Sequence, residues 1–498
     1  MLDWLKNKFS NIICQAKFNM FINFLNKKPV DANVYLFYKL IFTSLIVAIL
    51  SSLNSYLGII FLFLIVLLSI NKFKFIAYLS ILCSGFHGIL QLNGLSPISS
   101  AIDVVFTIIL YMQLMLYLII KRRVEVMLSN NVYMIIGLLA TMTFSVLLSK
   151  YNNDYIFLLL YLKDFFIPLT AFFYFYILIR EKIIDSEDVI KFLYYGILIV
   201  SIFSLLHYMF NITDVFDRYV PRRGLKGDEF GSVRVVMGVS ITRMNSLFVL
   251  STQGASSCLY AIGLYLSIFE NKFLKIKRIV ALLYATIFLL CGIFAVSFSF
   301  VLTFIIITLT NAVTSSSVYL KLISVITGSG VLLLASLFLS VDDGNRSVSL
   351  IPYAWDGFIR PAIGVLDKMS FGDFIFGFGL IPKLYYNEYL SLDAKNFLSN
   401  VIYDNWLLGA FLQVGFLYVL ISILLLVFVF HRLNTTKNKS TFLSALIFLS
   451  LIGFSHGFFL LDRLFIFKAT LLLAIIFNDH VNVKSDTMLK YIKRKFFG

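Results

Sequence analysis

Charged residues are scarce in this chain of 498 residues, since only 14% are Asp, Glu, Lys or Arg while 60% are hydrophobic. Little polar sequence is therefore left for a soluble domain of ordinary size. The hydrocarbon core of a bilayer is about 30 Å thick, so a helix that crosses it needs roughly 20 apolar residues. Backbone groups in lipid must be hydrogen-bonded within their own structure, which excludes open strands there. The long apolar runs therefore predict membrane-spanning helices.

Residues that form disulfides or bind metals are scarce too, with 4 cysteines and 5 histidines. The long polar segments 211–248 and 341–401 contain no cysteine, so no disulfide is expected to hold them. The histidines are scattered and no group of carboxylates has the spacing of a cation site, so no metal is expected. No glycine-rich phosphate loop is present, so we expect no cofactor and no use of ATP by this chain.

The apolar segments predict an all-α, polytopic integral membrane protein with about 14 transmembrane helices. The break near Ala295, between the ninth and tenth segments, matters most, because one bent span there would reverse the side of every later loop. The predicted spans are roughly 37–53, 57–70, 75–91, 102–120, 131–149, 156–179, 189–210, 249–269, 279–295, 297–313, 318–340, 402–430, 441–458 and 464–479.

Lysine and arginine predict the orientation of these spans, because they are enriched in cytoplasmic loops. Alternate short loops are basic, as in Lys121–Arg123 and Lys272–Arg278, whereas 51–56 and 92–101 contain no Lys or Arg. Both termini are therefore expected in the cytoplasm, and both long polar segments on the periplasmic face. This topology and attraction to anionic membrane lipid explain most of the net charge of +16, so we expect no nucleic-acid partner.

The spans and the charges together give a domain organisation. Apolar residues at helical spacing between Leu2 and Phe24, with lysines among them, predict an amphipathic leader on the inner membrane surface, or alternatively a basic tail with little order. The expected order is a cytoplasmic leader over 1–36, transmembrane helices 1–7 over 37–210, a first large periplasmic loop over 211–248, helices 8–11 over 249–340, a second large periplasmic loop over 341–401, helices 12–14 over 402–479, and a basic cytoplasmic tail over 480–498.

Arginine outnumbers lysine in the first large loop, on the face where topology alone would not place it. A guanidinium pairs with phosphate or carboxylate oxygens through two parallel hydrogen bonds, so these residues predict an anion-binding site. The alternative is that each arginine only anchors a helix end at the headgroups. The candidates from the two large loops are Arg222, Arg223, Arg243, Arg346 and Arg360.

Other polar residues lie at or within the predicted spans. Asp404 and Asn405 lie at the outer mouth of the twelfth span, where a carboxylate can accept a proton from a sugar hydroxyl or only cap the helix. Tyr385 can stack on a sugar ring or lie at the membrane interface. Lys163 and Asp164 fall within the sixth span, where ionisable groups usually face a cavity, although a structural role is the alternative.

Several of these residues carry a family resemblance. An arginine is followed after ten residues by a glycine in both loop regions, from Arg243 to Gly254 and from Arg346 to Gly357. The second large loop contains GFG at 377–379, and YDNWLLGAFLQVG follows at 403–415. With two large outer loops and about fourteen spans, this pattern resembles the Wzy-type O-antigen polymerases, which share a class of membrane glycosyltransferases with the O-antigen ligases. Ligases of this class tend to carry a histidine where this chain has Asp404. Many relatives also place an arginine in the segment that reads AVSFSFVLTF here, where this chain has none.

The resemblance implies a fold similar to GT-C-type glycosyltransferases and a metal-independent polymerase of O-antigen or another surface polysaccharide. Such an enzyme joins undecaprenyl-pyrophosphate-linked repeat units at the outer face of the bacterial inner membrane, during lipopolysaccharide or polysaccharide biosynthesis. Arg243 and Arg346 would neutralise the departing pyrophosphate, and Asp404 would orient or deprotonate the acceptor hydroxyl. A chain-length regulator and a flippase are candidate protein partners. An O-antigen ligase, or a flippase or transporter, are the alternative functions.

Overall fold

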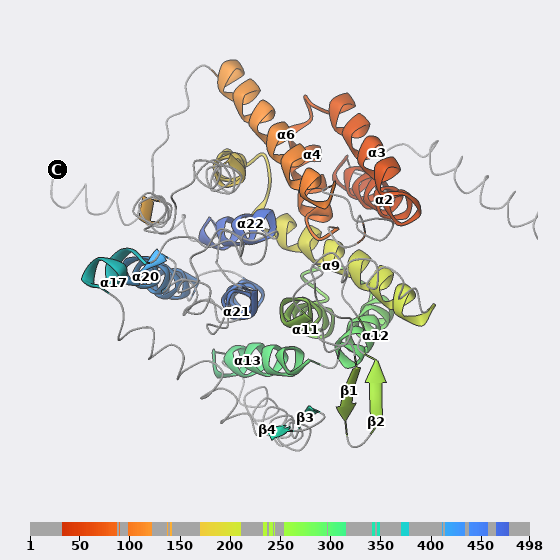
Figure 1. The fold of residues 1–498 in the computed structure, drawn as a ribbon. Coiled ribbons are helices and arrows are strands. Elements are labelled where there is room, and N and C mark those ends of the chain that lie inside the picture. Colours follow the sequence, from red (N-terminus) through yellow and green to blue (C-terminus); the bar gives the residue numbers. More distant parts are fainter. Residues whose placement is uncertain are drawn as a thin grey trace, which may run out of the picture.

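The computed structural model describes residues 32–86, 89, 98–121, 137, 140–141, 170–210, 233–236, 239–242, 244, 253–295, 297–314, 341–343, 346–348, 370–377, 411, 414–433, 438–456 and 465–477. These residues are predominantly helical, as the sequence predicts, with two short antiparallel hairpins added (Figure 1). The helices are α2 (Ala32–Leu53), α3 (Ser55–Leu68), α4 (Phe73–Cys83), α6 (Ile98–Lys121), α9 (Ser186–Met209), α11 (Gln253–Phe269), α12 (Arg278–Phe294), α13 (Phe298–Thr314), α17 (Phe371–Phe376), α20 (Phe416–Leu433), α21 (Lys439–His456) and α22 (Phe465–Ile476). A further helix covers Thr170–Arg180, and the strands are β1 (Val233–Val236), β2 (Val239–Thr242), β3 (Val341–Asp343) and β4 (Arg346–Val348).

Helices therefore occur at most of the predicted spans, but their number across a membrane is not established by length alone. Two helices among the described residues, Tyr35–Leu53 and Ser186–Met209, are long and apolar enough to cross a membrane. Two such helices are weak evidence, because a buried core helix or a segment near the N-terminus has the same properties. The other apolar helical stretches with described side chains contain 10–17 residues. The predicted spans 131–149 and 318–340 lie almost wholly outside the described residues.

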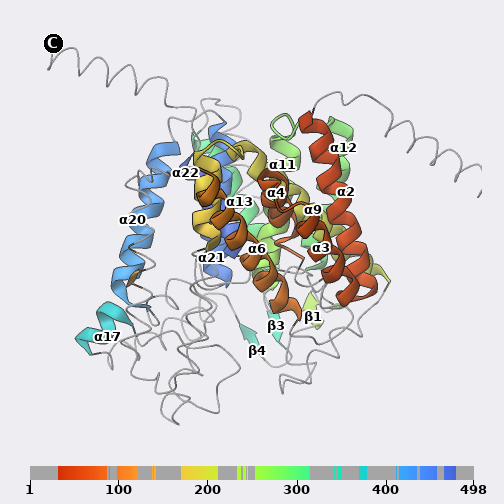
Figure 2. The ribbon, with the colours of Figure 1, turned by 90° about the horizontal axis from the view of Figure 1, so that it is seen from above.

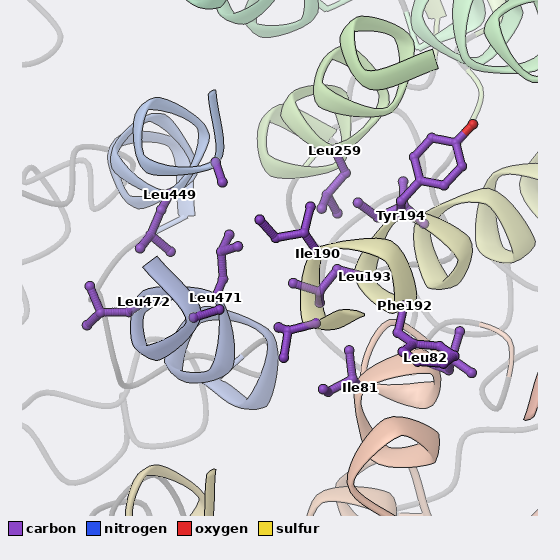
Figure 3. Close-up of a cluster of buried hydrophobic side chains, with 14 of the residues drawn as sticks. Ile81, Leu82, Ile190, Phe192, Leu193, Tyr194, Leu259, Leu449, Leu471 and Leu472 are labelled. Carbon is purple, nitrogen blue, oxygen red and sulfur yellow. The ribbon is translucent and has the colours of Figure 1, made fainter. Parts of the chain in front are cut away.

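Helix α9 lies at the centre of the packed helices and contacts α4, α11, α12 and α22. Its buried Ile190 and Leu193 point toward side chains from four other helices (Figure 3). A Cβ added at Gly196 would lie 2.9 Å from the carbonyl oxygen of Leu82, so α4 and α9 pack backbone against backbone there. The surrounding core residues labelled in the close-up are Ile81, Leu82, Leu259, Leu449, Leu471 and Leu472.

The chain reverses direction between α12 and α13. Helix α11 contacts both of them, and a connection over 270–277 joins α11 to α12 as a helical hairpin. Helix α13 runs in the same direction as α11. Thr303 Oγ1 lies 3.1 Å from Cys258 Sγ near the start of both helices, and near their ends Asn311 and Glu270 bond the same turn of α21. The predicted ninth and tenth spans are therefore separate helices that run in opposite directions.

Several connections between helices lie at one end of the helical body and are linked there by hydrogen bonds. The Tyr78 hydroxyl donates to Asp188 Oδ2 and accepts from the Asp185 N–H, both at 3.2 Å. Asn438 Nδ2 donates to Glu187 Oε1 at 2.8 Å. These bonds join α4, α9 and the start of α21. We call this region the short-loop end, and it comprises residues 71–72, 181–185, 270–277 and 438.

Glu270 extends this network. Its carboxylate accepts hydrogen bonds from Ser440 Oγ at 2.6 Å and from Thr441 Oγ1 at 2.9 Å, at the N-terminus of α21. An anion is favourable at a helix N-terminus because the first backbone N–H groups are unpaired. The bonds therefore fix the end of α11 against the start of α21.

Two of the short connections have the same backbone geometry. Lys182 and Lys275 have φ angles of 56° and 58°, in the left-handed region that glycine adopts most readily. Lys275 N bonds Lys272 O, and Ile276 N bonds Asn271 O, which is the paired pattern that commonly ends a helix. Lys182 and Ile183 repeat it after the helix Thr170–Arg180. Lysine thus occupies two positions where local geometry favours glycine.

Large apolar side chains also cover the outside of several helices. Ile279 on α12 and Leu68 on α3 are both 83% exposed, and Val427 on α20 is 61% exposed. No charged residue occurs between Lys39 and Lys72, a stretch that contains most of α2 and all of α3. The outer surface of these helices is therefore apolar along most of their length, and further exposed residues are Tyr38, Phe42, Leu57, Ile60, Phe63, Ile108, Met112, Leu282, Leu283, Leu420 and Leu424.

Candidate functional site

Short hairpins from the two large polar segments lie side by side. In the first segment β1 pairs with β2 so that Val233 faces Thr242, and in the second β3 pairs with β4 so that Asp343 faces Arg346. Strands β1 and β3 are in contact, and Figure 2 shows β1, β3 and β4 at one end of the helical body. Segments separated by about a hundred residues of sequence are thus brought together there.

This hairpin region is attached to the helices through α12. The Met244 N–H, two residues after β2 ends, donates to the Phe294 carbonyl oxygen at 2.8 Å. The Phe294 carbonyl belongs to the last turn of α12, where no further N–H of the helix can reach it. The Phe294 ring also packs on Tyr208 at the end of α9, with ring centroids 4.9 Å apart. We call the region formed by β1–β4, Met244 and Phe294 the hairpin end; the N-terminus of α12 lies at the short-loop end.

Helix α17, in the second large polar segment, is held at both of its ends. At its start the Ser370 hydroxyl accepts from Asp373 N, while Asp373 Oδ2 accepts from Ser370 N at 3.1 Å. This reciprocal arrangement is a capping box, and Asp373 is buried. At its end Gly377 has φ 74°, and its N–H donates to Asp373 O at 2.7 Å. Gly377 thus ends α17 in a backbone conformation that favours glycine.

The end of α17 packs against Gly415, immediately before α20. Gly415 has φ 91°, and a Cβ built there would lie 2.0 Å from Ile375 O and 2.6 Å from Gly377 N. The Phe374 ring stacks on Phe416, with centroids 5.4 Å apart. Two motifs that carry the family resemblance, GFG and YDNWLLGAFLQVG, therefore meet at Gly377 and Gly415.

Gly415 also corrects the prediction for the twelfth span. The sequence predicts one helix over 402–430, but α20 begins only at Phe416, after a residue in the left-handed region. Gly415 N still bonds Phe411 O at 2.8 Å, so a helical turn precedes the break. An α-helix of L-residues cannot pass through φ 91° without interruption. The hydrophobic pattern alone gave no sign of the break, because both sides of it are apolar.

The predicted site residues are placed only in part. The backbone of Arg346 lies in β4, which pairs with β3, the strand that contacts β1. Arg243 falls between Thr242, which ends β2, and Met244, which is bonded to α12. The Arg243 side chain lies outside the described residues. The other candidates lie outside them too, namely Arg222, Arg223, Arg360, Lys163, Asp164, Tyr385, Asp404 and Asn405.

Both hairpins were missing from the sequence prediction, although the sequence contains a signal for each. The run VRVVMGVSIT places two β-branched segments around Met237 and Gly238, and VDDGNRSV places Gly344 and Asn345 between two short segments. Two-residue connections that contain glycine or asparagine are typical of β-hairpins. Reading the large loops for period-two patterns would have found the strands that bring them together.

Comparison with known proteins gives no further identification. No protein-family model matches the chain, and no match is found among curated proteins or solved structures.

Proposed function

We propose that the chain is a polytopic membrane glycosyltransferase that polymerises lipid-pyrophosphate-linked oligosaccharide units at the outer face of a bacterial inner membrane. The observation that carries this proposal is the contact between β1 and β3, because it joins the two arginine-bearing segments at one end of the molecule. Arg346 begins β4, and Arg243 directly follows β2. Cationic side chains from both segments can then act on a single pyrophosphate.

The outer surface of the helices supports the membrane location. Soluble monomers rarely expose contiguous apolar patches larger than a few hundred Å², whereas apolar residues cover the outside of α2, α3, α6, α12 and α20. In a membrane, lipid covers such a surface, so its apolar side chains are not exposed to water. Charged residues of the short-loop end, such as Lys72 and Lys275, lie where helices begin and end.

The separation of the two ends supports the sidedness. The short connections that carry the positive charges, over 72–74, 180–182 and 272–278, lie toward the short-loop end. The hairpins of both large segments lie at the hairpin end. A cytoplasmic short-loop end and a periplasmic hairpin end agree with the positive-inside rule.

The reaction proposed for the hairpin end is a transfer between two lipid-linked sugars. The acceptor hydroxyl oxygen attacks the anomeric carbon at the reducing end of the growing chain. The bond from that carbon to the pyrophosphate oxygen breaks, and its electron pair leaves with the lipid pyrophosphate. Arg243 and Arg346 meet the charge that develops on this leaving group, assisted by Arg222, Arg223 and Arg360. The proton of the acceptor hydroxyl passes to the Asp404 carboxylate, which is proposed to lie beside that hydroxyl.

Mass spectrometry of lipid-linked glycans in a deletion strain tests this function. Loss of a polymerase leaves single repeat units on their lipid at the outer face of the membrane. Accumulated long chains would instead indicate a ligase, and single units trapped on the inner face would indicate a flippase. Either of those results overturns the proposal.

Labelling of single cysteines tests the sidedness independently. Cys83, Cys258 and Cys291 are buried, so replacement of Cys14 leaves little background. Cysteines placed at Gly227 and Asp393 should react with an impermeant thiol reagent added from outside, whereas one at Asn271 should not. Labelling of the two large segments from opposite sides would contradict the arrangement.

A further inference from the structure

The contact at Gly415 leaves no room for any side chain. A Cβ at this position would lie 2.0 Å from Ile375 O, 2.4 Å from the carbon of that carbonyl and 2.6 Å from Gly377 N. Real Cβ atoms essentially never come closer than 3.0 Å to such atoms. All three neighbours are backbone atoms, so no side-chain rotation relieves the clash. Even alanine would have to push α17 away from the start of α20.

Helix α17 cannot yield by bending, because its own contacts fix its shape. The capping box between Ser370 and Asp373 closes its first turn, and Gly377 N bonds Asp373 O in its last. The Phe374 ring contacts two others, Phe411 edge to face with centroids 5.3 Å apart and Phe416 stacked with centroids 5.4 Å apart. A displacement at Gly415 would therefore move α17 and the GFG turn as one body.

We propose that Gly415 is a positioning residue of the proposed transferase, the joint at which α17 fixes the second large loop against α20. This inference rests on the proposed function. The joint lies between the GFG turn and the end of the YDNWLLGAFLQVG motif, so it sets the angle between the second loop and the chain that leads into α20. Gly415 acts through these segments and does not itself touch substrate.

The expected effect is on turnover more than on binding. Reacting groups displaced by about 1 Å can lose roughly 10²-fold in rate even when the substrate still binds. Gly415→Ala should therefore lower kcat at least about tenfold and leave KM for the donor nearly unchanged. The probe is the lipid-linked repeat unit extracted from the deletion strain, added to purified protein in lipid nanodiscs.

Two glycines serve as matched controls. Gly372 lies in α17 itself, but a Cβ there meets only Ser370 Oγ at 3.9 Å, an ordinary contact. Gly372→Ala should leave both turnover and geometry unchanged. At Gly196 a Cβ would meet the Leu82 carbonyl oxygen at 2.9 Å, a backbone clash within the α4–α9 packing. Gly196→Ala should lower thermal stability without changing the kcat of the protein that remains folded.

A spectroscopic distance gives a measurement that does not depend on activity. Spin labels at Phe371 on α17 and Ile423 on α20, which are 79% and 44% exposed, report the angle at the joint. Gly415→Ala should lengthen or broaden the distance between them, and Gly372→Ala should not. If Gly415→Ala fails to fold, Asp373→Asn loosens the capping box without adding atoms and should broaden the same distance with a several-fold loss of kcat.

The results separate the two proposals. A shifted distance together with lowered kcat supports the positioning role. Three results for Gly415→Ala overturn the positioning role: an unchanged spin-label distance, a shifted distance with normal kcat, or a loss of kcat no larger than that of Gly196→Ala. In each case the wild-type protein still polymerises, so the proposed function stands. Absence of polymerisation by the wild-type protein overturns the proposed function, and with it the role of Gly415 in that reaction.

Discussion

The two ends of the helical body are held together by different parts of the chain. At the short-loop end side chains make the links, as in Tyr78 with Asp188 and Glu270 with Ser440. At the hairpin end backbone groups pair the strands within each hairpin and join Met244 N to Phe294 O. The contact of Gly415 with Ile375 O is also made by backbone.

The two kinds of link differ in how they respond to substitution. Backbone links do not depend on side-chain identity except where glycine is required. Under the proposed function, we therefore expect substitutions at the hairpin end to affect activity more than folding. At the short-loop end the side chains are themselves the links, so changing them should affect stability more than activity. Each of the following substitutions tests one side of this contrast.

The largest effect is expected from Asp404→Asn. It removes the proposed proton acceptor and keeps the size and most hydrogen bonds of the side chain, so polymerisation should fall about 10²–10⁴-fold. Single lipid-linked units should accumulate, as mass spectrometry would show. The matched control is Asp185→Asn at the N-terminus of α9, where the side chain accepts from Glu187 N. Asparagine caps a helix about as well as aspartate, so the control should behave as wild type. Polysaccharide of normal length from the Asp404→Asn protein would show that Asp404 acts only as a helix cap.

Arg243→Lys should come next, with a loss of about 10²–10³-fold in polymerisation. Lysine keeps the charge but lacks the planar pair of donors that fits a phosphate. The amount of protein in the membrane, measured by immunoblot, should stay near normal. Arg278→Lys is the matched change at the exposed start of α12, and it should have no effect. Loss of the Arg243→Lys protein from the membrane would indicate an anchoring role instead.

Glu270→Ala should have the opposite profile. It removes an anionic acceptor from two hydroxyl groups at the N-terminus of α21, and each hydrogen bond to a charged group is worth about 1.5–3 kcal/mol. We expect a loss of stability of about 3 kcal/mol, the lower end of the sum of the two bonds, because Glu270 is only half-buried; thermal unfolding in detergent measures it. Lys272→Ala in the same connection should change little. A fall in kcat of the folded Glu270→Ala protein would contradict the expectation that changes at the short-loop end affect stability more than activity.

The smallest effect, and a favourable one, is expected from Lys182→Gly and Lys275→Gly. Both lysines adopt left-handed φ angles, which cost L-residues about 1–2 kcal/mol, and part of that gain is offset by the greater freedom of glycine when unfolded. Each change should raise stability by about 0.5–1 kcal/mol. Lys272→Gly, in the same connection, should not stabilise. The proposed topology explains why lysine occupies these positions, because lysines are enriched in cytoplasmic loops.

The sequence predicts the helices well because a long apolar run has few other structures available. The separation of α12 from α13 follows the predicted break near Ala295. The sequence fails where distant segments meet. The packing of α17 against Gly415 depends on a contact between Ile375 and Gly415, which lie 40 residues apart in the sequence, and no local pattern encodes it. The contact between β1 and β3 likewise joins segments that are distant in the sequence. The candidate arginines and Asp404 remain predictions, since their side chains lie outside the described residues.

The reversal between α12 and α13 has a consequence for how the protein is made. Only residues 295–297 separate the two helices. Under the proposed membrane location, this connection is too short to let α12 insert into the bilayer while α13 stays outside it. Both helices would have to enter the bilayer as a pair as they leave the ribosome, onto α11 already in place. Truncation after Phe294 should therefore leave α12 poorly inserted, even though its own sequence is largely apolar after Arg278.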